Sequence, residues 1–228
     1  HTRYISVTGV QTCALPISGK DNNSVQLSVP TVFDILDITS LINDAPQTFS
    51  LGETTVTWTA TDEAGNSASI SQRVIVEDTT LPIITPPADI VSEANSFDNN
   101  SISLGKADAS DLVEITTIIN DAPQTFKLGD TVVTWTVTDS AGNMASATQK
   151  VTITDTTAPK ITSPENLTVE ATSSSENTIS LSLPSAVDAV SDVFITNDAT
   201  SVFPLGDTIV TWTATDEAEN SASVTQKI

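Results

Sequence analysis

The stretch "TWTATDEAGNSAS" at residues 57–69 returns as "TWTVTDSAGNMAS" at 134–146 and as "TWTATDEAENSAS" at 211–223. The tryptophans of the three copies, Trp58, Trp135 and Trp212, are 77 residues apart each time (135 − 58 = 77; 212 − 135 = 77). A period of this length is too long for one unit of a solenoid and suits a small domain. The chain of 228 residues is therefore interpreted as an array of three copies of one domain.

The repeated stretch has the pattern of a half-buried β-strand. In "TTVTWTATD" the residues Val56, Trp58 and Ala60 alternate with threonines, which is a period of two. Threonine and valine suit a pleated surface, and no segment of useful length shows the 3.6-residue apolar stripe of a helix. Several short strands with turn signals in each period predict an all-β fold of antiparallel two-sheet sandwiches.

The three tryptophans are predicted to lie in the cores. Each stands in mid-strand on the apolar face, and burying about 200 Å² of its surface contributes on the order of 5 kcal/mol. That is comparable with the net stability of a small domain. The other interpretation of these side chains, as stacking platforms for sugars, is less favoured by their position.

The turn after the strand is expected to need a positive φ. Gly65 and Gly142 supply it in the first two copies, because glycine has no Cβ to oppose that conformation. Glu219 stands at this position in the third copy, so we expect that turn to be strained or differently shaped.

The repeats divide the chain into units 18–77, 78–154 and 155–228, the last of them cut short at its C-terminal end. Residues 7–17, "VTGVQTCALPI", do not match "ITPPADIVSEA" at 84–94. This peptide is residue for residue the translation of a common sequencing adapter. We therefore interpret residues 1–17 as an artefact, which leaves the first unit without its first strand.

Two phrases are specific to one family. The chain combines a "DTTLP" opening at 78–82 with "FKLGDTVVTWTVTDSAGN" at 126–143, and so resembles the hyalin repeat, or HYR, family over residues 18–228. The resemblance implies tandem immunoglobulin-like antiparallel β-sandwiches from an extracellular or cell-surface protein. Cysteine-free members are typical of long bacterial surface proteins.

Many members of the family join their first and last strands by a disulfide. The matching positions here are Pro86 with Ala147 and Ser163 with Val224, and the last-strand position of the first unit is Ile70. The resemblance therefore implies that the bridge is absent. Its stabilisation of roughly 2–4 kcal/mol must come from packing instead.

Several function classes are disfavoured by composition. His1, Tyr4 and Cys13 are the only residues of their types, and all lie within 1–17, so no imidazole- or thiol-based active site is expected. The recurring Asp62, Asp139 and Asp216 most simply accept turn amides. A net charge of −21 argues against binding nucleic acid or anionic membranes, and no apolar run is long enough to span a bilayer. We therefore assign no enzymatic activity and no catalytic, cofactor-binding or metal-binding residue.

Calcium at the linkers between units is one further interpretation. Glu77 and Asp78 stand at one joint and Asp155 at the next, where aspartates from turns of the adjoining unit could approach. Oxygen-rich clusters of this kind suit Ca²⁺. The other interpretation is a short, solvated linker stiffened by Pro82 and Pro159.

The sequence favours a mechanical and adhesive role. We expect a non-catalytic stalk or adhesion segment of a larger secreted or cell-surface protein, whose partner is an unknown extracellular protein or glycan. The alternative is an accessory polysaccharide-binding module of a secreted enzyme, which would need exposed aromatics, and Phe97 has no counterpart in the other units. A folded spacer without any partner is a third interpretation.

Overall fold

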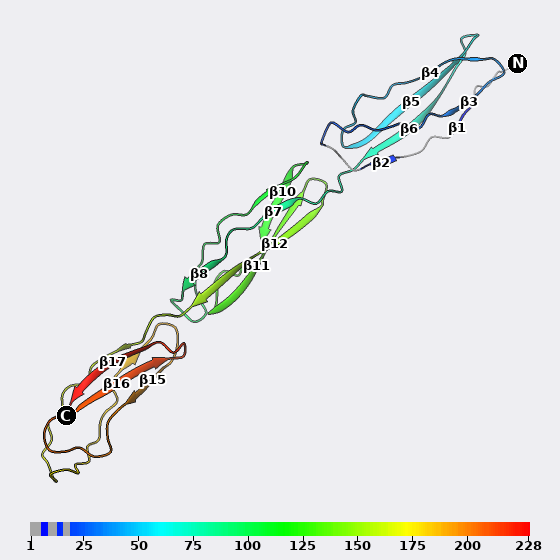
Figure 1. Ribbon diagram of the computed structural model, residues 1–228. Helices are drawn as coiled ribbons and strands as arrows, with labels where there is room; N and C mark the ends of the chain where they lie inside the picture. The colour runs from blue at the N-terminus through cyan, green and yellow to red at the C-terminus, as the bar shows by residue number, and fades with distance from the viewer. Residues whose placement is uncertain (1–5, 9–12, 16–18) are drawn as a thin grey trace. The chain divides into compact units, whose positions relative to one another are not determined.

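The computed structural model describes the backbone of residues 6–8, 13–15 and 19–228, and the side chains of residues 19–228. Over these residues the protein is all-β and contains no helix, which confirms the predicted fold class (Figure 1). The chain divides into two compact units. One comprises the described residues up to 87 with 106–120 and 134–148, and the other comprises 88–105, 121–133 and 149–228.

The first repeat has a four-stranded and a two-stranded sheet. Its strands are β1 (Ser6–Thr8), β2 (Cys13–Leu15), β3 (Thr31–Phe33), β4 (Ile38–Asn43), β5 (Gly52–Asp62) and β6 (Ser67–Val76). The larger sheet has the order β2-β6-β5-β4, and β1 pairs with β3. The repeated stretch forms the central hairpin, because its alternating pattern lets β5 and β6 pair continuously from Gly52–Val76 to Thr61–Ser67.

The second and third repeats follow the same plan. The second contains β7 (Ile83–Thr85), β8 (Ile90–Glu93), β9 (Asp108–Ser110), β10 (Ile115–Asn120), β11 (Gly129–Asp139) and β12 (Met144–Thr154). The third contains β13 (Lys160–Ile161), β14 (Ala186–Val187), β15 (Val193–Asn197), β16 (Ile209–Asp216) and β17 (Ser221–Lys227). β7 pairs with β9 as β13 does with β14, and β10 pairs with β11 as β15 does with β16.

Two findings modify the expected topology. The pairing is antiparallel except where β2 runs parallel to β6 and β8 runs parallel to β12. In addition, β1 and β2 lie within residues 1–17, the segment that the sequence analysis left out of the fold. Their pairings match those of β7 and β8 one period later. The expectation that the first unit lacks its first strand therefore differs from the structure, whereas the origin of residues 1–17 stays a hypothesis.

The cores are built around the tryptophans, as predicted. Trp58, Trp135 and Trp212 are 5%, 5% and 1% exposed. Trp58 Nε1 donates to Gln72 Oε1 at 2.9 Å, and Trp212 Nε1 donates to Gln226 Oε1 at 3.1 Å. A buried indole N–H needs such an acceptor, so the glutamine fourteen residues further on is part of the core.

Glu219 has the strained conformation that its position predicts. Its φ is +68°, against +82° at Gly65 and +92° at Gly142. The third turn thus keeps the shape of the other two, and the glutamate adopts the left-handed conformation that L-residues with a Cβ avoid.

Candidate functional site

Two clusters of three aspartates among the described residues are arranged so that they could hold a metal ion. The Asp78 cluster comprises Asp78, Asp111 and Asp139, and the Asp155 cluster comprises Asp155, Asp188 and Asp216. Within each cluster every residue offers a carboxylate oxygen, and these three oxygens all lie within 4.8 Å of one another. Such spacing puts three formal negative charges close enough to share one cation.

Local structure fixes each carboxylate of the Asp78 cluster. Asp78 lies between β6 and β7, Asp111 directly follows β9, and Asp139 ends β11. Asp78 Oδ1 accepts from the Thr80 amide at 2.9 Å, and Asp111 Oδ1 accepts from the Leu112 amide at 2.6 Å. These local bonds set the orientation of each carboxylate and use one of its two oxygens.

Asn143 connects two members of the Asp78 cluster. Its amide N–H and its Nδ2 donate to the two carboxylate oxygens of Asp139, at 2.9 and 2.8 Å. The same Nδ2 also donates to the backbone carbonyl of Asp78 at 3.1 Å. Asp78, the first residue of the second repeat, is thereby hydrogen-bonded to the turn between β11 and β12.

The Asp155 cluster repeats this arrangement. Asn220 donates from its amide and its Nδ2 to Asp216, at 2.8 and 3.0 Å, and from Nδ2 to the Asp155 carbonyl at 3.2 Å. Asp155 Oδ1 accepts from the Thr157 amide at 3.2 Å. Two copies of one geometry, 77 residues apart, show that the clusters belong to the repeat.

Burial and hydrogen bonding shift the pKa of three of the cluster carboxylates. Burial, followed by weaker contributions from Asp139 and Asp78, raises the pKa of Asp111. Burial likewise raises the pKa of Asp155, with smaller contributions from the Asp188 and Asp216 carboxylates. Burial also acts to raise the pKa of Asp139, but the hydrogen bonds from Asn143 and Ala141 outweigh it and the net shift is downward. The Asp78 cluster therefore combines Asp139, which is held ionised, with Asp111, which gains from a proton or a cation.

The structure groups the aspartates differently from the expected linker site. Asp78 and Asp155 do belong to the clusters, but Glu77 is not a member of either. The aspartates beside them come from their own repeat and not, as expected, from the adjoining unit. Asp139 and Asp216 accept turn amides, as predicted, and are cluster members as well. The sequence analysis missed Asp111 and Asp188 as partners, although their recurrence at one period was visible.

A second contact joins the second repeat to the linker that follows it. Glu93, the last residue of β8, accepts from the Thr156 amide at 2.9 Å and from the hydroxyls of Thr156 and Thr157 at 2.7 Å each. The Thr156 hydroxyl is the largest cause that lowers the pKa of Glu93. Both threonines of the "DTT" phrase are therefore bound by one ionised carboxylate.

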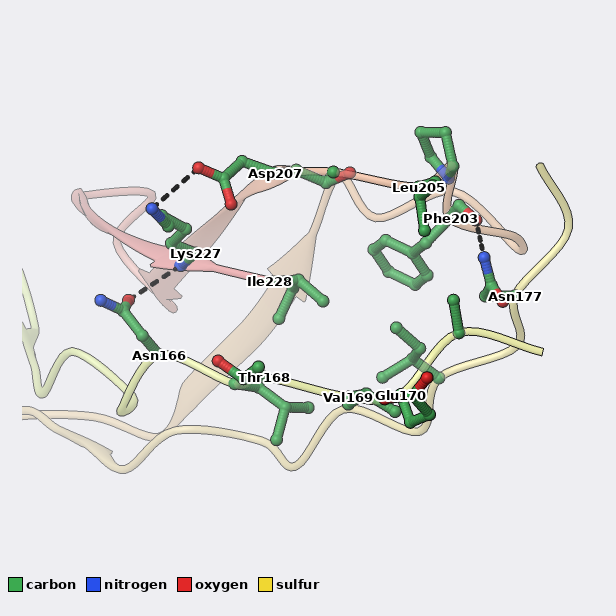
Figure 2. Close-up of a pocket in the computed structure, with 16 residues that line it drawn as sticks. Asn166, Thr168, Val169, Glu170, Asn177, Phe203, Leu205, Asp207, Lys227 and Ile228 are labelled. Atoms are coloured by element: carbon green, nitrogen blue, oxygen red, sulfur yellow. Dashed lines mark hydrogen bonds and ion pairs between the residues drawn. The ribbon is translucent and has the colours of Figure 1, made fainter. Parts of the chain in front are cut away.

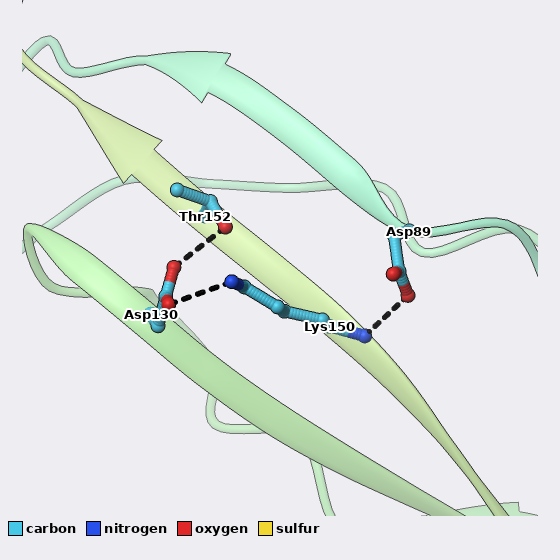
Figure 3. Close-up of polar contacts among 4 residues, drawn as sticks. All are labelled: Asp89, Asp130, Lys150 and Thr152. Carbon is cyan, nitrogen blue, oxygen red and sulfur yellow. Dashed lines mark hydrogen bonds and ion pairs between the residues drawn. The ribbon is translucent and has the colours of Figure 1, made fainter.

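The central hairpins carry ion pairs that repeat with the period. Figure 3 shows Asp130 between Lys150 Nζ, at 2.7 Å, and the Thr152 hydroxyl, at 2.6 Å, while the Lys150 amide donates to Asp89 at 2.8 Å. Arg73 with Glu53 and Lys227 with Asp207 occupy the same positions in the other repeats. These pairs are about half exposed and support the hairpins without forming a binding site.

The third repeat contains a cavity of about 230 Å³ at the position where β8 pairs with β12 in the second repeat. Figure 2 shows its lining by Thr168, Val169, Phe203 and Ile228, with the Lys227–Asp207 pair at its edge. Residues 167–170 correspond to β8, which pairs with 151–154 in the second repeat. Ile228 stands at the position of Val151, so this cavity lies beside the residues that correspond to β8.

His1, Tyr4 and Cys13, the three residues singled out by type, lie outside the residues whose side chains the structure describes. Within residues 19–228 no helix could cross a membrane. Ser163, to which the family resemblance assigned the first-strand cysteine position, donates its hydroxyl to the Thr225 carbonyl at 2.9 Å and so does lie beside the last strand.

Comparison with known proteins places the chain in a family. The HYR domain matches residues 10–76, 77–153 and 154–228. Hyalin of Strongylocentrotus purpuratus is 32% identical over 84% of this chain and 17% of the hyalin chain, and hyalin of Lytechinus variegatus is 32% identical over 90% and 42%. This chain thus spans less than half the length of either relative. A solved structure of protocadherin gamma B2 cadherin domains 3–6 is 14% identical over 99% of this chain and 77% of that one, at a TM-score of 0.36.

The three family matches take in nearly the whole chain, and each contains one tryptophan core. The protein belongs to the HYR domain family, as three consecutive repeats.

Proposed function

We propose that this chain is a non-catalytic stalk or adhesion segment of a larger extracellular or cell-surface protein. Support comes from the three consecutive HYR repeats and from the two hyalins, both far longer than this chain. A net charge of −21 also suits a repetitive β-protein, because it opposes the pairing of exposed sheet edges between molecules.

The bonding of the linker is the observation that carries the proposal. A segment that sets a distance or bears a load needs defined joints, because a freely jointed linker lets consecutive domains fold back. Glu93 binds three donors from Thr156 and Thr157, and Asn220 binds the Asp155 carbonyl. The linker residues 155–157 are therefore held on both sides by side chains of the repeats they connect.

Small-angle X-ray scattering of the intact chain tests this role. Strands of about eight residues span about 25–30 Å, so three repeats in line give a maximum dimension of roughly 100 Å. We expect that value for the native chain and a broader distance distribution for Glu93→Ala, with Glu170→Ala as the matched control outside the 155–157 linker. A compact particle for the native chain would contradict the stalk.

Polysaccharide binding is the competing function. Burial of the three tryptophans removes them as stacking platforms. Phe97, which is 56% exposed, lines a hollow of about 360 Å³ together with residues 188–192 and Glu217, and three of these neighbours carry carboxylates. An acidic setting of this kind opposes acidic polysaccharides. Retention of the chain on a glycan array, lost in Phe97→Ala, would favour this alternative over the stalk.

A further inference from the structure

We propose that the Asp78 cluster and the Asp155 cluster each bind one Ca²⁺ ion. The inference does not depend on the proposed stalk function, because it concerns sites contained within single repeats. Each cluster gathers three carboxylates from three separate segments of the chain. One oxygen of each carboxylate lies within 4.8 Å of one oxygen of each of the other two.

Buried oxygens without hydrogen bonds are the second observation that points to a cation. Asp78 is 7% exposed and Asp155 is 9% exposed. The Oδ2 atom of each is buried and accepts no hydrogen bond among the described residues, and the same holds for Asp111 Oδ2. A buried carboxylate oxygen without a donor is costly, and a cation shared with the neighbouring carboxylates removes that cost.

The geometry leaves these oxygens available for a metal. In Asp78, Asp111 and Asp155 the Oδ1 atom accepts a local backbone amide, which fixes the carboxylate and leaves Oδ2 free. Asp139 and Asp216 are held by asparagine donors and have lone pairs left for a cation. The ligands are therefore oriented before any ion arrives.

Calcium fits this donor set better than other common ions. All of the donors are oxygens, and neither cluster contains histidine or cysteine, which zinc and copper favour. Asp111 and Asp188 are only partly buried, so water can complete the six to eight ligands that Ca²⁺ takes. Mg²⁺ requires a nearly ideal octahedron at shorter distances and gives up its water reluctantly.

The first repeat supplies a natural comparison. Asp34 and Asp62 stand at the positions of Asp111 and Asp139, and Asp62 has the same two bonds from Asn66, each at 2.8 Å. The position that corresponds to Asp78, one period earlier, is His1, which lies outside the described residues. We therefore expect two calcium sites in the chain and none of this kind in the first repeat.

Calcium titration of the chelator-treated chain tests the proposal. Isothermal calorimetry with CaCl₂ at physiological salt should give two sites, with dissociation constants of about 10⁻⁴–10⁻³ M, the range of extracellular modules. Asp111→Asn and Asp188→Asn should each remove one site, and the double variant should remove both. Asp34→Asn, the matched change in the first repeat, should leave two.

Folding and ion selectivity complete the test. Circular dichroism in EDTA should show every variant folded, and Ca²⁺ should raise the melting temperature of the native chain but not that of the double variant. Failure to bind calcium at millimolar concentration would overturn the proposal. Calcium binding that persists in the double variant would overturn the proposal too, because it would indicate diffuse binding to an acidic surface. Equal affinity for Mg²⁺ would refute the assignment to calcium.

Discussion

Replacing Glu219 by glycine should stabilise the third repeat. Glu219 has a φ of +68°, and an L-residue with a Cβ in this region pays about 1–2 kcal/mol. Glycine removes that penalty but costs about 0.5–1 kcal/mol in the entropy of the unfolded chain. The net gain is about 0.5–1 kcal/mol, which corresponds to a rise in melting temperature of roughly 2–8 °C for a domain of this size.

Native-state hydrogen exchange read by mass spectrometry is the assay, because it resolves the repeats within the intact chain. Peptides from β16 and β17 should gain protection in Glu219→Gly, while those from β5 and β6 should not change. Gly142→Glu is the reciprocal variant in the second repeat. A Cβ added at Gly142 meets no atom within 4 Å, so its φ of +92° is the source of the expected loss.

Glu219→Ala separates the backbone from the side chain. Alanine keeps the Cβ and therefore the strain, so this variant should match the native chain within about 0.5 kcal/mol. Equal stabilisation by Glu219→Ala and Glu219→Gly would refute the reasoning, because the gain would then come from removing a negative charge.

Three further changes test the core, the turn and the linker. Trp212→Ala should cost about 3–5 kcal/mol and unfold or nearly unfold the third repeat in urea, and a cooperative transition close to the native midpoint would speak against the buried core. Asn100→Ala removes the hydrogen bonds from Nδ2 to the carbonyls of Ser96 and Phe126, at 2.7 and 2.9 Å, and should lower the free energy of unfolding by about 2–4 kcal/mol. Replacing the exposed neighbour, Asn99→Ala, should leave the thermal melt of the chain unchanged. Because the pKa of Glu93 is lowered, its hold on Thr156 is present above the ordinary glutamate pKa and lost as pH falls through the folded value. Exchange of the Thr156 amide should therefore quicken in acid relative to Glu93→Gln, and an identical pH profile for the two proteins would exclude this contact.

Local pattern was enough to predict the fold, because the strand period and the turn residues act over a few positions. The alternation around Trp58 predicted both a buried face and the β5–β6 hairpin, and the glycine-to-glutamate change predicted strain at Glu219. The parallel pairing of β8 with β12 was not predicted. It depends on which edge of a sheet a short strand meets, and the four residues of β8 carry no information about that edge.

The polar partners of the core escaped prediction for a related reason. Gln72 lies opposite Trp58 only after β5 and β6 pair in register, and a glutamine between a serine and an arginine looks like a surface residue. The aspartate clusters are similar: Asp78, Asp111 and Asp139 are about thirty residues apart, and no short motif connects them. Their recurrence with the period was the available signal, but recurrence alone does not say which repeated residues meet.

The first repeat decides how the unpartnered oxygens should be understood. Asp34 Oδ2 is buried without a hydrogen bond, as Asp111 Oδ2 is, although the residue one period before Asp78 is a histidine. An unpartnered oxygen at the position of Asp111 is therefore a property of the repeat, and the buried Oδ2 atoms of Asp78 and Asp155 are the ones that point to an ion. What distinguishes the second and third repeats is the third carboxylate, which raises the negative charge and completes the cluster. Calcium binding that is sensitive to Asp111→Asn and insensitive to Asp34→Asn would show that the third carboxylate makes the site, and equal sensitivity of the two would show that it does not.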